Sequence, residues 1–284
     1  MKAGFWVAPE GAEEAMTIVE LGFDPLAEAP KNPISFLATS DAAEMIRRCP
    51  RAAQMLPELA KALEEQKEDE PGRLFDLTEF NPDDAELIKQ VLGEGEVSGV
   101  VALPDGITAQ IQESTMAGLW RVRFTDAEDR LFADYLEVSR LPEVAKRAAL
   151  VNARELTYGE PPAGAMNVMP LLKEIESRSA GHLPGQPTHT ITFSLLPMNP
   201  VDMGYLQNRL GAGSVKLVSK GYSSCRILST GTRHVWSVQY YNTMDTIILD
   251  TLEIGDAPAA ACAAEVDFRD SAERLREIDE AYFR

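Results

Sequence analysis

Cysteines and histidines are the side chains of this sequence best suited to redox or metal chemistry, and they are few. The chain has three of each, namely Cys49, Cys225, Cys262, His182, His189 and His234. A thiolate is a nucleophile and a metal ligand, and a neutral imidazole is a metal ligand and a general base. The histidines form no close metal-binding spacing and the cysteines form no CxxC pair. The sequence therefore predicts reduced thiols, no disulfide framework and no metal site.

Cys225 has the most suggestive neighbours of the three thiols. It lies in "KGYSSCRI", where the adjacent Arg226 is expected to lower the thiol pKa. If the chain turns at "STGT", His234 would lie near Cys225 on the neighbouring strand. Two other interpretations stay open for Cys225, a buried apolar filler and a contact with a partner protein. Cys262, within "AAACAAEV", is interpreted mainly as a residue that packs a helix.

Motifs for enzymatic chemistry are missing from the sequence. There is no G-x-S-x-G elbow and no P-loop, and the carboxylates are too numerous to single out a catalytic pair. The segment "LGAGSV" at 210–215 has the glycines of a phosphate-binding loop, but a helical pattern precedes it and a strand pattern follows it. We therefore expect no enzyme, and we interpret this segment as a helix end followed by a strand.

Composition and charge narrow the class of protein further. The 284 residues are 45% hydrophobic and carry 27 basic against 45 acidic side chains, a formal net charge of −18. A chain of this composition can bury a core, and its acidity disfavours nucleic acid and anionic membranes as partners. The sequence contains neither a signal-peptide pattern nor an apolar run long enough to span a membrane. It predicts a cytoplasmic protein without membrane insertion.

An internal repeat organises the elements that must position these side chains. "LGEGEV" at 92–97 matches "LGAGSV" at 210–215 with an offset of 118, and "FDLTEFNPDD" matches "FSLLPMNPVD" with the same offset. Further along, Trp120, Val122 and Phe124 match Trp236, Val238 and Tyr240 with an offset of 116. Such self-similarity indicates two tandem copies of one structural unit, which we call the first and second modules.

Each module reads as a helix, three or four antiparallel strands and a closing helix. The first helix has Asn81 or Asn199 as N-cap, proline at its first position, and Gly93 or Gly211 at its end. The strands are predicted at "VSGVVAL", "ITAQIQE", "LWRVRFT" and "RLFADYLEV" in the first module and at "VKLVS", "CRILST", "HVWSVQYY" and "TIILDTLEI" in the second. Closing helices are predicted from Pro142 and from Pro258. This is an α+β fold built by tandem duplication.

The expected boundaries follow from these patterns. They are an N-terminal extension and helix at 1–52, the first module at 53–150, a linker at 151–166, the second module at 167–265, and a C-terminal helix at 266–284. Ser271 is the expected cap of the last helix, and Ala272, Leu275, Ile278 and Tyr282 form its apolar stripe. This helix either covers an exposed face or contacts another protein.

Differences between the modules suggest where a functional site lies. A residue that the fold needs should occur in both modules, whereas "GYSSCRI" occurs only in the second. The candidate partner or thiol site therefore comprises Tyr222, Cys225, Arg226, Arg233, His234 and Cys262. Trp120 and Trp236, present in both modules, are expected in the core.

The second module resembles the HupH/HyaF/HoxQ family of hydrogenase expression and formation proteins. The resemblance rests on "G-Y-x-x-C-R-I", "T-R-x-V-W" and "T-L-E-I" within residues 165–275, and the first module is similar more loosely. Family members often have glycine where this chain has Ser223, so a strained turn is expected there.

The resemblance implies an accessory protein for maturation of an uptake [NiFe] hydrogenase. Such a protein would act in the cytoplasm as a chaperone on the precursor of the iron-sulfur small subunit, before its twin-arginine export, together with a thioredoxin-like partner of the HyaE/HupG/HoxO type. No resident cofactor is implied. Two alternatives stay open: a thiol protein that transiently holds an iron-sulfur cluster through Cys225 and possibly Cys262, and a regulator that binds a small molecule between the modules.

Overall fold

One antiparallel sheet of ten strands runs through both modules in the computed structural model, which describes residues 46–151, 153–221 and 224–283. The strand order is β1-β5-β4-β3-β2-β7-β8-β9-β10-β6, so the second half mirrors the first. The α+β fold and the tandem duplication are thereby confirmed. The strands of the first module are β1 (Arg73–Asp76), β2 (Val97–Ala102), β3 (Thr108–Glu113), β4 (Leu119–Thr125) and β5 (Leu131–Val138). Those of the second are β6 (His189–Thr192), β7 (Ala212–Ser219), β8 (Ser224–Thr230), β9 (Val235–Tyr241) and β10 (Ile247–Ile254).

The seam between the modules is the antiparallel pair of β2 and β7. Gly99 lies opposite Leu217, its own equivalent at the offset of 118, so a local two-fold axis passes between them. A Cβ on Gly99 would lie 2.5 Å from Leu217 Cδ2 and would overlap the carbonyl oxygen of Lys216. The close approach of the two modules therefore requires glycine at this position.

The helices α4 and α7, which precede the main strands of each module, begin and end where the sequence predicts. In α4 (Pro82–Leu92) the Asn81 side chain accepts a hydrogen bond from Asp84 N, and in α7 (Pro200–Leu210) Asn199 accepts one from Asp202 N. Gly93 and Gly211 follow these helices with φ of 60° and 66°, a conformation that glycine adopts without steric cost. The two N-caps and the two glycine stops are thus confirmed.

A buried aspartate joins the first two helices of each module. Asp84 accepts a hydrogen bond from Ala52 N in α3 (Pro50–Glu65), and its side chain is fully buried. Asp202, at the equivalent position, accepts hydrogen bonds from Met166 N and Val168 N at the start of α6 (Val168–Ala180). Both aspartates therefore cap a second helix besides their own.

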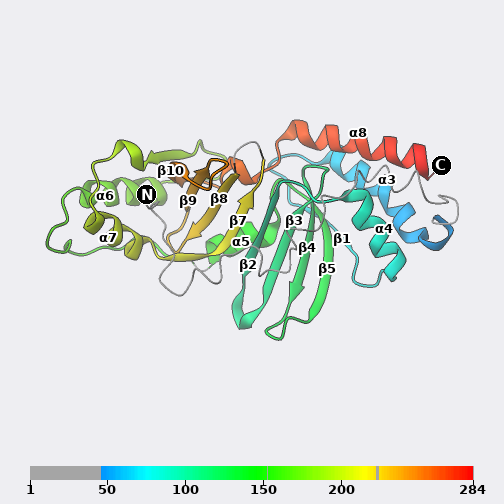
Figure 1. Cartoon of the computed structure of the whole chain (residues 1–284), viewed down its shortest axis with the longest axis horizontal. Helices are drawn as coiled ribbons and strands as arrows, with labels where there is room; N and C mark the ends of the chain where they lie inside the picture. The colour runs from blue at the N-terminus through cyan, green and yellow to red at the C-terminus, as the bar shows by residue number, and fades with distance from the viewer. Residues whose placement is uncertain (1–45, 152, 222–223, 284) are drawn as a thin grey trace.

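Helices cover the sheet on both faces. One face is covered near its centre by α5 (Glu143–Val151) and the short turn η5 (Ala259–Ala261), over a core that includes Trp120 and Trp236, both of which are buried as expected. On the other face α3, α4 and α8 (Glu265–Tyr282) pack on the first module, and α6 and α7 pack on the second. Figure 1 shows these two groups of helices at opposite ends of the molecule.

Two expectations about the C-terminal part are wrong. The segment after Pro258 forms only the three-residue turn η5, because Ala263 N then bonds across the seam to Arg140 O at 3.0 Å and the chain crosses to the first module. The last helix begins at Glu265 rather than at Ser271, since the Asp267 carboxylate accepts from Ala264 N one turn earlier. Ser271 instead lies inside α8 and donates to Ala117 O at 2.9 Å.

The C-terminal helix covers the first module. Ala272, Leu275 and Ile278 are buried against α3, so the covering role is the alternative that the structure supports. The side chain of Tyr282 lies outside the described residues. Two short edge strands, β1 and β6, were not predicted. Within the described ranges, no helix has both the length and the apolar character that a membrane span requires.

Candidate functional site

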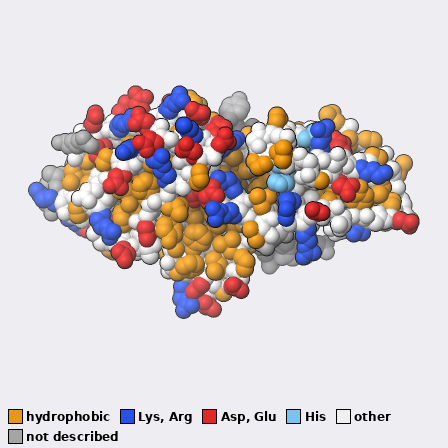
Figure 2. Space-filling model, turned by 180° about the vertical axis from the view of Figure 1, so that it is seen from behind, with side chains coloured by type: hydrophobic (Ala, Val, Ile, Leu, Met, Phe, Trp, Pro, Cys, Tyr) orange, Lys and Arg blue, Asp and Glu red, His pale blue; other side chains and the backbone are white. Residues whose placement is uncertain are grey.

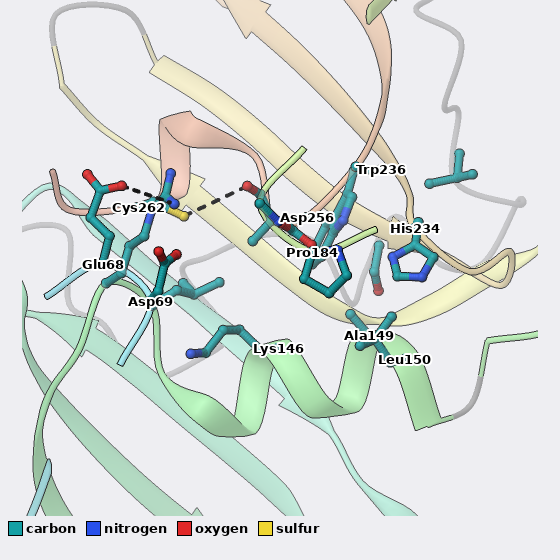
Figure 3. A pocket seen from close by; sticks show the side chains of 17 residues that line it. Glu68, Asp69, Lys146, Ala149, Leu150, Pro184, His234, Trp236, Asp256 and Cys262 are labelled. Carbon is teal, nitrogen blue, oxygen red and sulfur yellow. Dashed lines mark hydrogen bonds and ion pairs between the residues drawn. The ribbon is translucent and has the colours of Figure 1, made fainter. Parts of the chain in front are cut away.

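A cavity of about 250 Å³ lies where equivalent segments of the two modules meet. Residues 140–146 follow β5 and residues 256–262 follow β10, and both segments line the cavity. Figure 3 shows Lys146 of α5 and Cys262 on its walls, two positions that are equivalent at the offset of 116. The cavity therefore exists because the duplication brings these two connections together at the seam.

The lining of the cavity combines charged and aromatic groups. Arg140 forms an ion pair with Glu68 at 3.7 Å near one end, with Asp69 beside them. Trp236 and His234 lie toward the other end (Figure 3). Such a site has polar groups for orientation and an apolar wall, as small-molecule sites commonly do.

Cys262 lies in this cavity rather than in a helix. It follows η5 in an extended conformation, and its Sγ lies 3.9 Å from Ala257 O. Burial raises the pKa of the Cys262 thiol to about 11, although the nearby Arg140 acts in the opposite direction. The thiol is therefore protonated at neutral pH, and the interpretation of Cys262 as a helix-packing residue is wrong because the helix does not form.

Cys225 is a core residue on β8. Only 2% of it is exposed, and burial raises the pKa of its thiol. The expectation that Arg226 lowers this pKa is therefore wrong. The proximity to His234 is wrong as well, because Cys225 pairs with Tyr240 while His234 lies in the turn beyond Thr230. Roughly 16 Å of extended strand separates these two ends of β8.

The remaining candidate residues of the second module lie apart from one another. Arg226 is on the face of β8 opposite Cys225, and its guanidinium stacks 5.3 Å from the ring centroid of Tyr241. Arg233 is exposed in the turn between β8 and β9, where its backbone N–H donates to Arg154 O. Tyr222 and Ser223 lie outside the described residues. The structure therefore does not gather the predicted set into one site.

His234 instead meets two residues that sequence reasoning did not select. Its ring centroid is 4.7 Å from that of His182, and His182 Nε2 is 3.0 Å from Asp256 Oδ1. The other carboxylate oxygen of Asp256 accepts from Gly185 N at 2.8 Å. His182 and Asp256 are 74 positions apart in the sequence, so no local spacing could reveal the group. We call His182, His234 and Asp256 the histidine cluster.

The pKa values of His234 and Asp256 are both lowered by their surroundings in the histidine cluster. Burial, followed by the charge of His182, lowers the pKa of His234. The pKa of Asp256 is lowered too, because its hydrogen bonds with His182 and Gly185 outweigh the effect of burial. At neutral pH the cluster thus contains a neutral His234 and an ionised Asp256.

A second hollow near the seam contains a carboxyl group with an unusual pKa. Glu113, at the end of β3, lines it together with Glu96 and Asp267. Burial raises the pKa of Glu113 to about 7, although Gly118 N donates to this carboxylate at 3.3 Å, and the negative charges of Glu96 and Asp267 act in the same direction as burial. Glu113 therefore changes its charge near neutral pH.

An apolar surface lies at the end of the first module's sheet, away from the cavity. Figure 2 shows hydrophobic side chains gathered over the projecting ends of the first module's strands. Leu131 and Phe132, at the start of β5, are 54% and 50% exposed, and Phe132 contacts Phe124 with ring centroids 6.2 Å apart. We call Phe124, Leu131 and Phe132 the β5 patch. A patch of this kind marks an interaction surface more often than an isolated apolar residue does.

Comparison with known proteins reveals relatives along the whole chain. The family model described as "HupH hydrogenase expression protein, C-terminal conserved region" matches residues 50–151 and again residues 165–282. The hydrogenase expression/formation protein HupH of Rhizobium leguminosarum bv. viciae is 59% identical over 100% of both chains. The chain belongs to the HupH/HyaF/HoxQ family. The two matches also confirm the duplication, because each covers one module.

Two further relatives are also named for hydrogenases. The hydrogenase expression/formation protein HoxQ of Cupriavidus necator is 40% identical over 83% of both chains. The hydrogenase-1 operon protein HyaF of Escherichia coli is 34% identical over 84% of this chain and 83% of its own. The family resemblance inferred from the second module is therefore confirmed and extends to the first.

Proposed function

We propose that this protein is an accessory factor for the maturation of a [NiFe] uptake hydrogenase. In the proposal it acts in the cytoplasm, binds the precursor of the iron-sulfur small subunit before export and assembly, and catalyses no reaction. The observation that carries the proposal is membership of the HupH/HyaF/HoxQ family, whose members compared above are named for hydrogenase expression, formation or a hydrogenase operon. A thioredoxin-like protein of the HyaE/HupG/HoxO type is the second proposed partner.

The state of the thiols supports a binding role over a redox role. Cys225 is buried and the pKa values of Cys225 and Cys262 are both raised, whereas a cluster ligand or a nucleophilic thiol needs the thiolate. The alternative in which these two thiols hold an iron-sulfur cluster therefore gains no support from their surroundings. A binding role needs only a surface that fits the client.

The β5 patch is the surface that we propose for the client. The C-terminal helix is less suitable, because its apolar stripe is buried against α3. A precursor that has not yet assembled with its partner subunit exposes apolar surface, which aromatic side chains such as Phe132 can cover. The second module offers a matched position, since Ile248 is equivalent to Phe132 at the offset of 116 and is 58% exposed.

Affinity capture from cells that produce the hydrogenase tests this proposal. The tagged full-length chain should retain the small-subunit precursor, and the double variant Leu131→Ser, Phe132→Ser should retain roughly tenfold less, since removal of an aromatic anchor typically costs more than about 1 kcal/mol. Ile248→Ser is the matched control and should retain as much as the unchanged chain. Absence of the precursor from every capture would refute the function, whereas equal capture by all variants would refute only the β5 patch.

A further inference from the structure

The β3–β4 turn of the first module and the β8–β9 turn of the second end in the same backbone geometry. The two turns differ in the residue that occupies the last position. In the first module Ser139 N donates to Gly118 O at 3.0 Å, and in the second Gly255 N donates to His234 O at 2.9 Å. Both pairs are equivalent at the offset of 116, and both acceptors have positive φ, 83° at Gly118 and 62° at His234. The fold thus requires a residue with a left-handed backbone conformation at the position of Gly118 and His234.

A histidine at such a position has a conformational cost that glycine does not have. Side chains with a Cβ rarely adopt positive φ, and residues held in that region cluster at functional sites. The first module fills the position with Gly118, so the backbone geometry itself does not need an imidazole. The presence of His234 in the second module therefore calls for a reason that lies in its side chain.

The side chain of His234 points to the other members of the histidine cluster. One ligand atom each from His182, His234 and Asp256 can be chosen so that all three lie within 4.8 Å of one another. In a tetrahedral Zn²⁺ site with bonds of about 2.0–2.1 Å, neighbouring ligand atoms are about 3.4 Å apart. The separations of the three atoms in the folded chain therefore exceed the spacing around one ion by at most about 1.4 Å.

We propose that His182, His234 and Asp256 form a binding site for a divalent transition-metal ion such as Zn²⁺. Two imidazoles and one carboxylate are a ligand set that such ions favour, and they arise here from three separate connections: the segment after α6, the β8–β9 turn and the end of β10. The first module has Gly118 and Arg140 in place of His234 and Asp256, so it lacks the site.

The surroundings of the histidine cluster provide the support that metal ligands need. Gly185 N holds one oxygen of Asp256 and leaves Oδ1 directed at His182, in the way that outer hydrogen bonds orient metal ligands. The imidazole of His182 is only 4% exposed, which shields that side of the site from water. His234 and Asp256 also line the cavity at the seam, so water or a small ligand can complete the coordination from there.

Another histidine of the chain provides a matched control. His189 Nε2 lies 2.7 Å from Glu174 Oε1, so this pair has the same donor types as His182 and Asp256. It is not part of the three-ligand group that the described residues contain. If a histidine beside a carboxylate were enough to bind the metal, the His189–Glu174 pair and the histidine cluster would bind added metal equally well.

Titration of the full-length chain with Zn²⁺, after treatment with a chelator and its removal, tests the proposal. Calorimetry should give one strong site per chain, and His234→Gly or Asp256→Asn should weaken it about 100-fold or more. His234→Gly installs the residue that the first module uses, so it should fold normally, as its circular dichroism will verify. His189→Gln should change the affinity less than about twofold.

Imidazole signals in ¹H–¹⁵N NMR spectra give a second, independent readout, because the chain has three histidines. One equivalent of Zn²⁺ should shift the signals of His182 and His234 and leave those of His189 in place. The proposal is overturned if the unchanged protein takes up no Zn²⁺, if His234→Gly binds as tightly as the unchanged protein, or if the signals of His189 shift as much as those of the other two.

Discussion

Glu113 provides a quantitative test of the energetics near the seam. Burial raises the pKa of this carboxyl group to about 7 in the folded chain, against 4.5 when it is freely solvated. The folded protein therefore holds the proton more tightly than the unfolded chain. The stabilisation that follows is fully present below pH 4.5 and is lost as the pH rises through about 7. The difference between the two pKa values corresponds to about 3 kcal/mol.

Substitution of Glu113 by glutamine removes this pH dependence. Glutamine stays neutral and can still accept the hydrogen bond from Gly118 N, so Glu113→Gln should be nearly neutral at pH 4.5 and stabilising by up to about 3 kcal/mol at pH 8. Urea unfolding of both proteins at the two pH values measures the free energy of unfolding, and the comparison of variant with parent cancels the other titrating groups. An equal difference between the two proteins at both pH values would refute the reasoning.

Three further predictions follow from the described contacts. Gly99→Ala should lower the free energy of unfolding by about 1–3 kcal/mol, because its Cβ would overlap Lys216 across the seam. Gly204→Ala, on an open part of α7, should instead raise the free energy of unfolding by about 0.5–1 kcal/mol. Thermal unfolding of both variants measures these opposite effects. Asp202→Ala should cost at least about 2 kcal/mol in urea unfolding, because several backbone N–H groups at the start of α6 lose their acceptor. In the native protein at pH 7, Cys225 and Cys262 should react with iodoacetamide far more slowly than after unfolding, as mass spectrometry of the labelled peptides can measure, and equal rates would contradict their raised pKa values.

Local rules predicted much of the fold. Trp120 and Val122 alternate with arginines along β4, and the equivalent residues alternate along β9, so the inward face of the sheet could be derived from sequence. The caps at Asn81 and Asn199 follow from short-range hydrogen bonding. The edge strands β1 and β6 were missed because four residues are too few to show a period.

Contacts between distant segments account for the errors. The residues after Pro258 have helical propensity, but the bond from Ala263 to Arg140 across the seam directs the chain to the first module instead. The register of the β8–β9 hairpin places His234 at the end of β8 far from Cys225. His182 and Asp256 were not selected, since only the folded chain brings them to His234.

Direct binding of purified components tests the central claim, that this protein recognises the hydrogenase small-subunit precursor. Native mass spectrometry of the full-length chain mixed with the precursor should show a complex of defined stoichiometry, which the double variant Leu131→Ser, Phe132→Ser weakens and Ile248→Ser does not. A precursor that remains free at micromolar concentrations of the unchanged protein would contradict the account.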